Sequence, residues 1–246
     1  MLFINPEIRD EMERISKSYA SLIAPLRESL AKISEEYSKL ISIPKIQIPP
    51  SLKAVDRIRK AQYVYWDFLD DKYIDAILSS NDIDSTLLSF ENDDQYSGIE
   101  KILTDLSEDA TINKRNELFK EIKETFEDGK YSISVIGIAA LIDFVLTDTT
   151  GKSTHNANKR CDAILEKIKS NDEVTSDEYA LMTLALTYHE MMDTFYEYAP
   201  FESSEPDALN RNWIMHGRSV RQITKLDCIK LFRFLRGIIL INKIYS

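Results

Sequence analysis

The sequence predicts an all-α protein, and three observations lead to that fold class. Apolar residues recur at spacings of three and four along most of the chain, which is the period of a helix with one buried face. Only 6 glycines and 7 prolines occur among 246 residues, too few for the many turns of an all-β fold. Hydrophobic residues make up 43% of the chain, which is enough to bury a substantial core.

The first 110 residues are predicted to form an N-terminal helical region. Pro6 to Ile43 has the pattern of a long amphipathic helix, which we interpret as a packing or dimerisation element. Residues 43–51 contain three prolines and are expected to form an extended connector. Lys53 to Ser79 is predicted as one further helix, and the acidic stretch 81–95 as a loop.

Residues 111–246 are predicted to form a second helical domain. Tyr131 to Thr147 is apolar on nearly all faces and is therefore expected to be a buried central helix. Thr224 and Asp227 have the spacing of a capping box at the start of the last helix. The other helices of this domain are predicted at residues 113–128, 157–168, 176–198 and 207–216, and a short helix is predicted before it at 97–105.

The sequence also indicates the cellular compartment in which the protein is expected. Two cysteines, Cys161 and Cys228, do not resemble a disulfide framework and favour a reducing environment. No run reaches the roughly 18 consecutive apolar residues of a membrane helix, and residues 1–5 lack the features of a signal peptide. We therefore expect a cytoplasmic protein that does not associate with membranes.

Charge is distributed unevenly along the chain. The net charge is −10, yet residues 208–246 contain eight basic residues and a single acid, Asp227. A concentrated basic patch favours contact with phosphates, whatever the average charge. Alternatively, these basic residues solvate a terminal helix and pair with acids elsewhere in the chain.

The most informative segment lies inside this basic region. It places Arg211, Asn212 and His216 within six residues. A guanidinium fits a phosphate with a planar fork of donors, and an imidazole transfers protons near neutral pH. On a helix, Asn212 and His216 share a face, whereas Arg211 and His216 lie about 140° apart. Arg211 and His216 can therefore converge through the length of the arginine or across a dimer.

The pattern Arg-Asn-x-x-x-His resembles the Arg-x(4–6)-His signature of the HEPN superfamily. The longer string Leu-Asn-Arg-Asn-x-x-x-His-Gly is similar to the form found in a subgroup of bacterial HEPN proteins. Residues 138–144 also resemble the earlier family helix that carries an acid, here Asp143, toward the site. The resemblance covers residues 113–246 and leaves the first 110 residues unexplained.

The resemblance implies a HEPN-like helical bundle that dimerises to form a composite RNA site. It implies a metal-independent endonuclease without cofactors, in which the ribose 2′-OH attacks the adjacent phosphate. Its biological setting would be a toxin–antitoxin system or antiphage defence by abortive infection, with an antitoxin or a phage-derived trigger as a further partner. The alternative is a non-catalytic helical module that binds RNA or a protein.

Residue roles follow from the same resemblance. His216 would transfer protons, Arg211 would hold the phosphate and stabilise its developing charge, and Asn212 would orient His216 or contact the phosphate. Asp143 is either an active-site carboxylate or a core acid that needs a partner, for which Arg211 is suitable. The candidate RNA-backbone contacts are Arg218 and Arg221.

A second histidine, His189, lies in a pattern that partly matches a zinc motif. His189-Glu190-x-x-Asp193 differs from the zinc motif His-Glu-x-x-His in its last residue, and no third ligand is evident. We therefore expect His189 to lie on an ordinary amphipathic helix face and predict no metal.

Overall fold

The computed structural model describes residues 49–66, 69–91, 98–151, 158–163, 166, 176–200 and 202–245. Within these ranges every regular element is a helix and no strand occurs, which confirms the all-α fold class. The predicted helix from Pro6 to Ile43 lies outside the described residues, as do five of the twelve residues of the stretch predicted as a helix at 157–168. Residues 158–163 of that stretch are helical.

Residues 49–246 form one unit, separate from residues 1–48. The division falls inside the predicted connector 43–51, whereas the sequence placed the domain boundary near residue 110. The region 49–110 belongs with the rest because its buried side chains, among them Ile58, Leu69 and Leu103, join one continuous apolar core with those of residues 111–246.

Ten helices of the second unit are described along their length. Their bounds are α2 (Pro50–Lys60), α3 (Asp71–Ser79), α4 (Ile83–Phe90), α5 (Ile99–Ser107), α6 (Ala110–Asn113), α7 (Asn116–Glu127), α8 (Tyr131–Thr150), α10 (Ser176–Phe195), α11 (Arg211–Met215) and α12 (Lys225–Tyr245).

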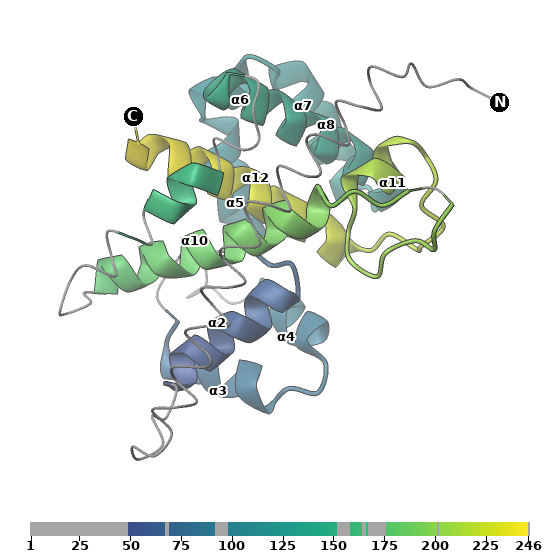
Figure 1. Cartoon of the computed structure of the whole chain (residues 1–246). Coiled ribbons are helices and arrows are strands. Elements are labelled where there is room, and N and C mark those ends of the chain that lie inside the picture. Colours follow the sequence, from purple (N-terminus) through teal and green to yellow (C-terminus); the bar gives the residue numbers. More distant parts are fainter. Residues whose placement is uncertain are drawn as a thin grey trace. The chain divides into compact units, whose positions relative to one another are not determined.

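Helices α8 and α12 form the centre of this unit. The C-terminal helix α12 packs against α8, α5 and α10, and α8 in turn packs against α7 and α11 (Figure 1). Gly137 permits the close approach of α7 and α8, because a Cβ there would lie 2.6 Å from Cγ1 of Ile122. By length and composition Tyr131–Thr149 could cross a membrane, but core helices of globular proteins meet the same criterion. It lies at the centre of the unit as predicted, but it is not buried on all faces, because Ile133 and Ile136 are exposed.

The stretch predicted as one helix from Lys53 to Ser79 contains two helices, and residues 61–66 and 69–70 between them are not helical. Helix α2 ends at Lys60, and Gln62 adopts a left-handed backbone conformation with φ of 55°. The Gln62 side chain explains the break, because it accepts a hydrogen bond from the Leu209 amide (2.6 Å) and donates to the Leu209 carbonyl (3.1 Å). This contact lies 147 residues away in sequence and overrides the local helical pattern.

The acidic stretch predicted as a loop contains a helix, α4, so that prediction was wrong. Asp82 caps the helix by accepting a hydrogen bond from the amide of Ser85 at 3.1 Å. Leu87 and Phe90 are buried on the inner face of α4. The acids around this helix obscured a short amphipathic pattern.

The predicted capping box at the start of α12 is confirmed. The Asp227 carboxylate accepts hydrogen bonds from the amide and the hydroxyl of Thr224, both at 2.8 Å, and Oγ1 of Thr224 accepts from the Asp227 amide at 3.3 Å. The start of the most buried helix is thereby fixed beside the candidate site segment.

Candidate functional site

The signature segment forms a shorter helix than the sequence predicted. Helix α11 begins at Arg211, not at residue 207, because Asn210 is extended and caps it. Its side-chain oxygen accepts hydrogen bonds from the amides of Asn212 (3.1 Å) and Trp213 (3.2 Å). The preceding residue, Leu209, is held by Gln62, so the chain cannot continue the helix backward.

The C-terminal end of α11 is fixed by a Schellman motif. Gly217 has a φ of 62°, a conformation that other residues adopt only with strain. Its amide donates to the Ile214 carbonyl (3.1 Å), and the Arg218 amide donates to the Trp213 carbonyl (2.9 Å). His216 is the C-cap residue. The glycine after the histidine is therefore explained by helix termination.

Arg211 forms an ion pair with Asp143 of α8. Nε and Nη2 of the guanidinium donate to the same carboxylate oxygen, Oδ2, at 3.1 and 2.6 Å. The other carboxylate oxygen, Oδ1, accepts a hydrogen bond of 2.7 Å from the hydroxyl of Tyr196, just after α10. Three helical regions thus meet in one polar group, which we call the Tyr196–Asp143–Arg211 triad.

The triad lies at the surface on its arginine side. The Arg211 and Asp143 side chains are 33% and 29% exposed, so solvent and ligands can reach them. Within the described residues Nη1 of Arg211 has no hydrogen-bond partner, whereas Nε and Nη2 are engaged by Asp143. Burial and the nearby Asp143 carboxylate raise the pKa of Tyr196 far above its usual value, which keeps its hydroxyl protonated as a donor. The carboxylate orients Arg211 and leaves one of its edges available.

Asn212 has a partner in the loop before α11. Nδ2 of its side chain donates to the Ala199 carbonyl at 3.3 Å, and Nδ2 of the Asn210 side chain donates to the Glu197 carbonyl at 2.8 Å. These two bonds hold the extended stretch 197–199 against α11. The side chain of His216 is exposed at the end of the same helix. A role of Asn212 in orienting His216 remains a prediction.

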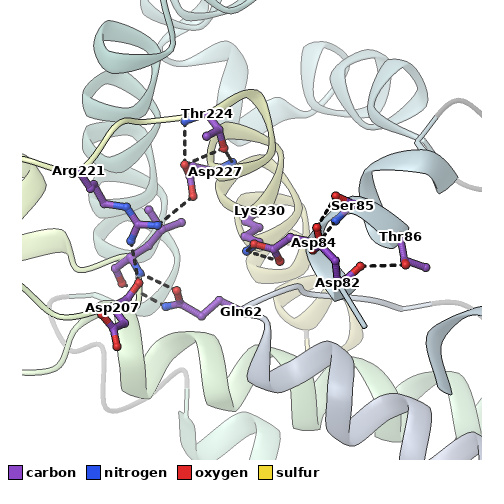
Figure 2. Close-up of polar contacts among 11 residues, drawn as sticks. Gln62, Asp82, Asp84, Ser85, Thr86, Asp207, Arg221, Thr224, Asp227 and Lys230 are labelled. Carbon is purple, nitrogen blue, oxygen red and sulfur yellow. Dashed lines mark hydrogen bonds and ion pairs between the residues drawn. The ribbon is translucent and has the colours of Figure 1, made fainter. Parts of the chain in front are cut away.

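The two predicted RNA-backbone contacts differ in their surroundings. Arg221 donates to the Asp207 carbonyl at 2.9 Å and lies 3.5 Å from a carboxylate oxygen of Asp227, so it contributes to the structure of this loop (Figure 2). Arg218 is exposed, and its guanidinium carbon lies 5.9 Å from the centre of the Trp213 ring. Arg218 is the more accessible of the two.

Most of the basic residues in α12 are paired with acids from other helices. Lys230 contacts Asp84 of α4 at 2.9 Å (Figure 2). The remaining pairs, each at 2.9 Å, are Arg233–Glu91, Arg236–Asp105 and Lys243–Asp109. Pairing with acids elsewhere in the chain, the alternative to a phosphate-binding patch, therefore accounts for these four residues.

His189 is paired with carboxylates along its helix. Nδ1 lies 3.0 Å from the Asp193 carboxylate, one turn further along α10, and Nε2 lies 3.8 Å from that of Asp162. The neighbouring Glu190 pairs with Arg59 of α2. The described part of the chain contains no group of three His, Cys, Asp or Glu side chains placed to hold a metal ion.

Cys161 and Cys228 are free, buried thiols. Burial raises the pKa of Cys228 to about 12 and that of Cys161 still further. Neither thiol forms an appreciable amount of the nucleophilic thiolate near neutral pH, so neither is a candidate nucleophile.

Three residues that position the site were missed by the sequence reasoning. Asn210 had a local signal, because Asn directly before a helix is a favoured N-cap. Tyr196 and Gln62 had none, since their partners are distant in sequence. Comparison of the chain with models of protein families, curated proteins and solved structures finds no match.

Proposed function

We propose that the protein is a metal-independent endoribonuclease with Arg211 and His216 in its active site. The observation that carries the proposal is the state of Arg211, whose guanidinium is oriented by Asp143 while Nη1 has no partner among the described residues. A guanidinium held in this way can bind a phosphate without first being ordered, which reduces the entropy lost on binding.

The residues of α11 suit cleavage by the ribose 2′-OH. A base removes the 2′-OH proton, the oxygen attacks the adjacent phosphorus, and the 5′-oxygen leaves after receiving a proton. The products are a 2′,3′-cyclic phosphate and a 5′-OH end. His216 transfers protons in this scheme, and Arg211 stabilises the negative charge that grows on the phosphate. Asn212, which holds the loop 197–199, is assigned a positioning role.

A second copy of the chain would complete the site. One copy supplies one His216, whereas the reaction needs both a base and an acid. Helix α8 carries two exposed apolar residues, Ile133 and Ile136, which are 62% and 45% exposed. Ile136 precedes Asp143 by seven residues and so lies two turns away on the same face, about 10 Å along the axis. Burying this face in a homodimer would bring two copies of α11 together.

The biological setting rests on the resemblance to HEPN proteins alone. A cytoplasmic toxin or antiphage ribonuclease of the abortive-infection type would cut cellular or phage RNA. Its partners would be RNA, a second copy of itself, and an antitoxin or a phage-derived trigger. Arg218, which is exposed close to α11, is the residue best placed to contact the RNA backbone.

The proposal is tested by incubating the purified protein with total cellular RNA in the presence of EDTA. We expect cleavage to persist, with 5′-OH and 2′,3′-cyclic phosphate ends. Removal of Arg211 takes away a donor to the developing charge, and such losses reduce turnover by about 10²–10³-fold. His216→Ala should have an effect at least as large.

A surface variant serves as the control for this test. Lys120→Ala removes an exposed lysine of α7 that pairs only with Glu117 of the same helix, and it should cut RNA at the parental rate. Circular dichroism should show the same helical content for all variants. Equal cleavage by the parent and His216→Ala, each prepared identically, contradicts the proposal.

The second candidate function is a non-catalytic module that binds a protein partner or RNA. The pairing of Lys230, Arg233, Arg236 and Lys243 with acids favours its protein-binding form, because these side chains are less available to RNA phosphates. Salt-sensitive RNA binding without any cleavage product would support this alternative over the nuclease.

A further inference from the structure

Tyr196, directly after α10, contacts the candidate site through its hydroxyl. It donates a 2.7 Å hydrogen bond to Oδ1 of Asp143, and Oδ2 of the same carboxylate binds Nε and Nη2 of Arg211. We propose that Tyr196 is a positioning residue, which holds the Asp143 carboxylate so that Arg211 presents its remaining edge to the substrate phosphate. This inference rests on the proposed nuclease function.

The geometry makes Asp143 dependent on a second anchor. The carboxylate has both oxygens engaged, one by Tyr196 and one by Arg211, and this fixes the torsion of its side chain. Without the hydroxyl, the carboxylate can rotate about its Cβ–Cγ bond and shift Arg211 with it. Displacements of about 1 Å in a catalytic group can lower turnover by about 10²-fold.

Tyr196 is placed rigidly enough to serve as this anchor. Its ring packs edge-on against Phe195, with ring centres 5.2 Å apart, and Phe195 is itself fully buried in the core. The ring therefore cannot follow the carboxylate if the hydrogen bond is lost. Tyr196→Phe removes only the hydroxyl and retains the ring.

Tyr188 provides a matched control on the same helix. It is fully buried, and its hydroxyl has no hydrogen-bond partner among the described residues. Tyr188→Phe thus removes a buried hydroxyl of α10 that takes part in none of the hydrogen bonds of the Tyr196–Asp143–Arg211 triad. Thermal unfolding of both variants would show whether either substitution acts through stability.

The test is a double-mutant cycle on single-turnover cleavage of a short RNA. We expect Tyr196→Phe to lower the cleavage rate constant about tenfold, in the range seen when outer-shell partners of a site are removed. Binding of the same RNA with a 2′-deoxy group at the cleavage position should change by less than about threefold, since the loss falls on the transition state. Tyr188→Phe should leave both quantities unchanged.

Repeating the Tyr196→Phe substitution in an Asp143→Ala background shows whether Tyr196 acts by positioning Asp143 or has a general structural role. If Tyr196 acts through Asp143, the substitution Tyr196→Phe should have almost no further effect once Asp143 is gone. An equal loss of rate in both backgrounds overturns the proposal, as does full activity of Tyr196→Phe in an otherwise active enzyme.

A spectroscopic measurement distinguishes failure of this inference from failure of the nuclease proposal. The Nε–H of Arg211 is protected by Asp143, and its exchange with solvent can be followed by nitrogen-15 NMR. Exchange should accelerate in Tyr196→Phe and stay unchanged in Tyr188→Phe. If exchange accelerates only in Tyr196→Phe but the parent cuts no RNA, Tyr196 does hold the Asp143 carboxylate. The nuclease proposal is then wrong, and so is the role of Tyr196 in cleavage. If the parent cuts RNA but the exchange of the Arg211 Nε–H is the same in Tyr196→Phe as in the parent, the inference about Tyr196 is wrong and the nuclease proposal stands.

Discussion

The same three chemical groups occur twice in this protein, in very different surroundings. In the Tyr196–Asp143–Arg211 triad a tyrosine hydroxyl and a guanidinium share one carboxylate. In the second triad, Tyr63–Glu91–Arg233, the Tyr63 hydroxyl and Nε of Arg233 both donate to Oε1 of Glu91, the latter at 2.9 Å. The side chains of Arg233 and Glu91 are 0% and 2% exposed, against 33% and 29% for Arg211 and Asp143.

This difference in exposure separates an arginine enclosed in the core from one that a ligand can reach. Arg233 is surrounded by aromatic rings as well as its carboxylate, with its guanidinium carbon 4.6 Å from the ring centre of Tyr63 and 5.3 Å from that of Trp66. No phosphate can reach it without opening the core. Arg211 has the same kind of orienting partners and remains accessible, which is the condition for binding a ligand.

The largest effect is expected from breaking the buried triad. Arg233→Met leaves the Glu91 carboxylate buried without its cation, which should cost about 3–5 kcal/mol of unfolding free energy. Arg211→Ala removes a half-exposed ion pair and should cost only about 0–1 kcal/mol, while abolishing cleavage. Urea unfolding of the two variants measures this contrast.

A double variant checks the cause of that destabilisation. Arg233→Met combined with Glu91→Leu removes both charges, and it should recover much of the lost stability because no isolated ion remains in the core. If Arg233→Met proves as stable as the parent, the buried pair does not hold α12 to the segment that carries Glu91, and the distinction between the two triads collapses.

An intermediate effect is expected from the apolar face beside the exposed triad. Ile136→Glu places a charge on the face of α8 that we assign to the dimer. The variant should sediment as a monomer and cut RNA about tenfold or more slowly, since burying an unpaired charge opposes association.

Ile244→Glu is the matched control for this prediction. Ile244 near the end of α12 is 46% exposed, against 45% for Ile136, so both substitutions add the same charge at equal exposure. Only the α8 variant should change the oligomeric state. A parent protein that is monomeric at all concentrations contradicts the composite site, although not the orientation of Arg211.

The contrast between the triads also shows what sequence reasoning can predict. The apolar periodicity indicated α5, α7, α8, α10 and α12, because each buries a continuous face whose spacing is local. The same local logic found the capping box at Thr224. The pairing of Arg211 with Asp143 was suggested by the resemblance to HEPN proteins together with the need of a buried acid for a partner.

What the sequence did not predict depends on contacts between distant residues. The break after α2 and the late start of α11 both follow from the contact of Gln62 with Leu209. The sequence does not single out Tyr63 and Tyr196, the tyrosines that bind the two carboxylates, because their partners are distant in the chain. The charge pattern of the C-terminal segment was likewise ambiguous, since the acids that pair with α12 come from α4, α5 and the segments next to them.

The smallest effect is expected where ion pairs lie at the surface, and it is visible as a pH dependence. The hydrogen bond to Asp193 raises the pKa of His189, with Asp162 and Glu190 adding to the effect, while its partial burial opposes it. A raised folded pKa means that this contribution is complete below the unfolded value of about 6.5 and is lost as pH rises through the folded pKa.

Unfolding free energy should therefore fall by roughly 0.5 kcal/mol as pH rises from about 6 through the raised pKa of His189, a magnitude typical of partly exposed pairs. In His189→Gln this fall should be absent, and chemical denaturation at a series of pH values measures it. The same slope in the parent and the variant would assign the pH dependence to another group. A fall of several kcal/mol would mean that the His189 pair contributes as much to the unfolding free energy as the buried Tyr63–Glu91–Arg233 triad. The exposure of a charged pair would then not predict its contribution to stability in this protein.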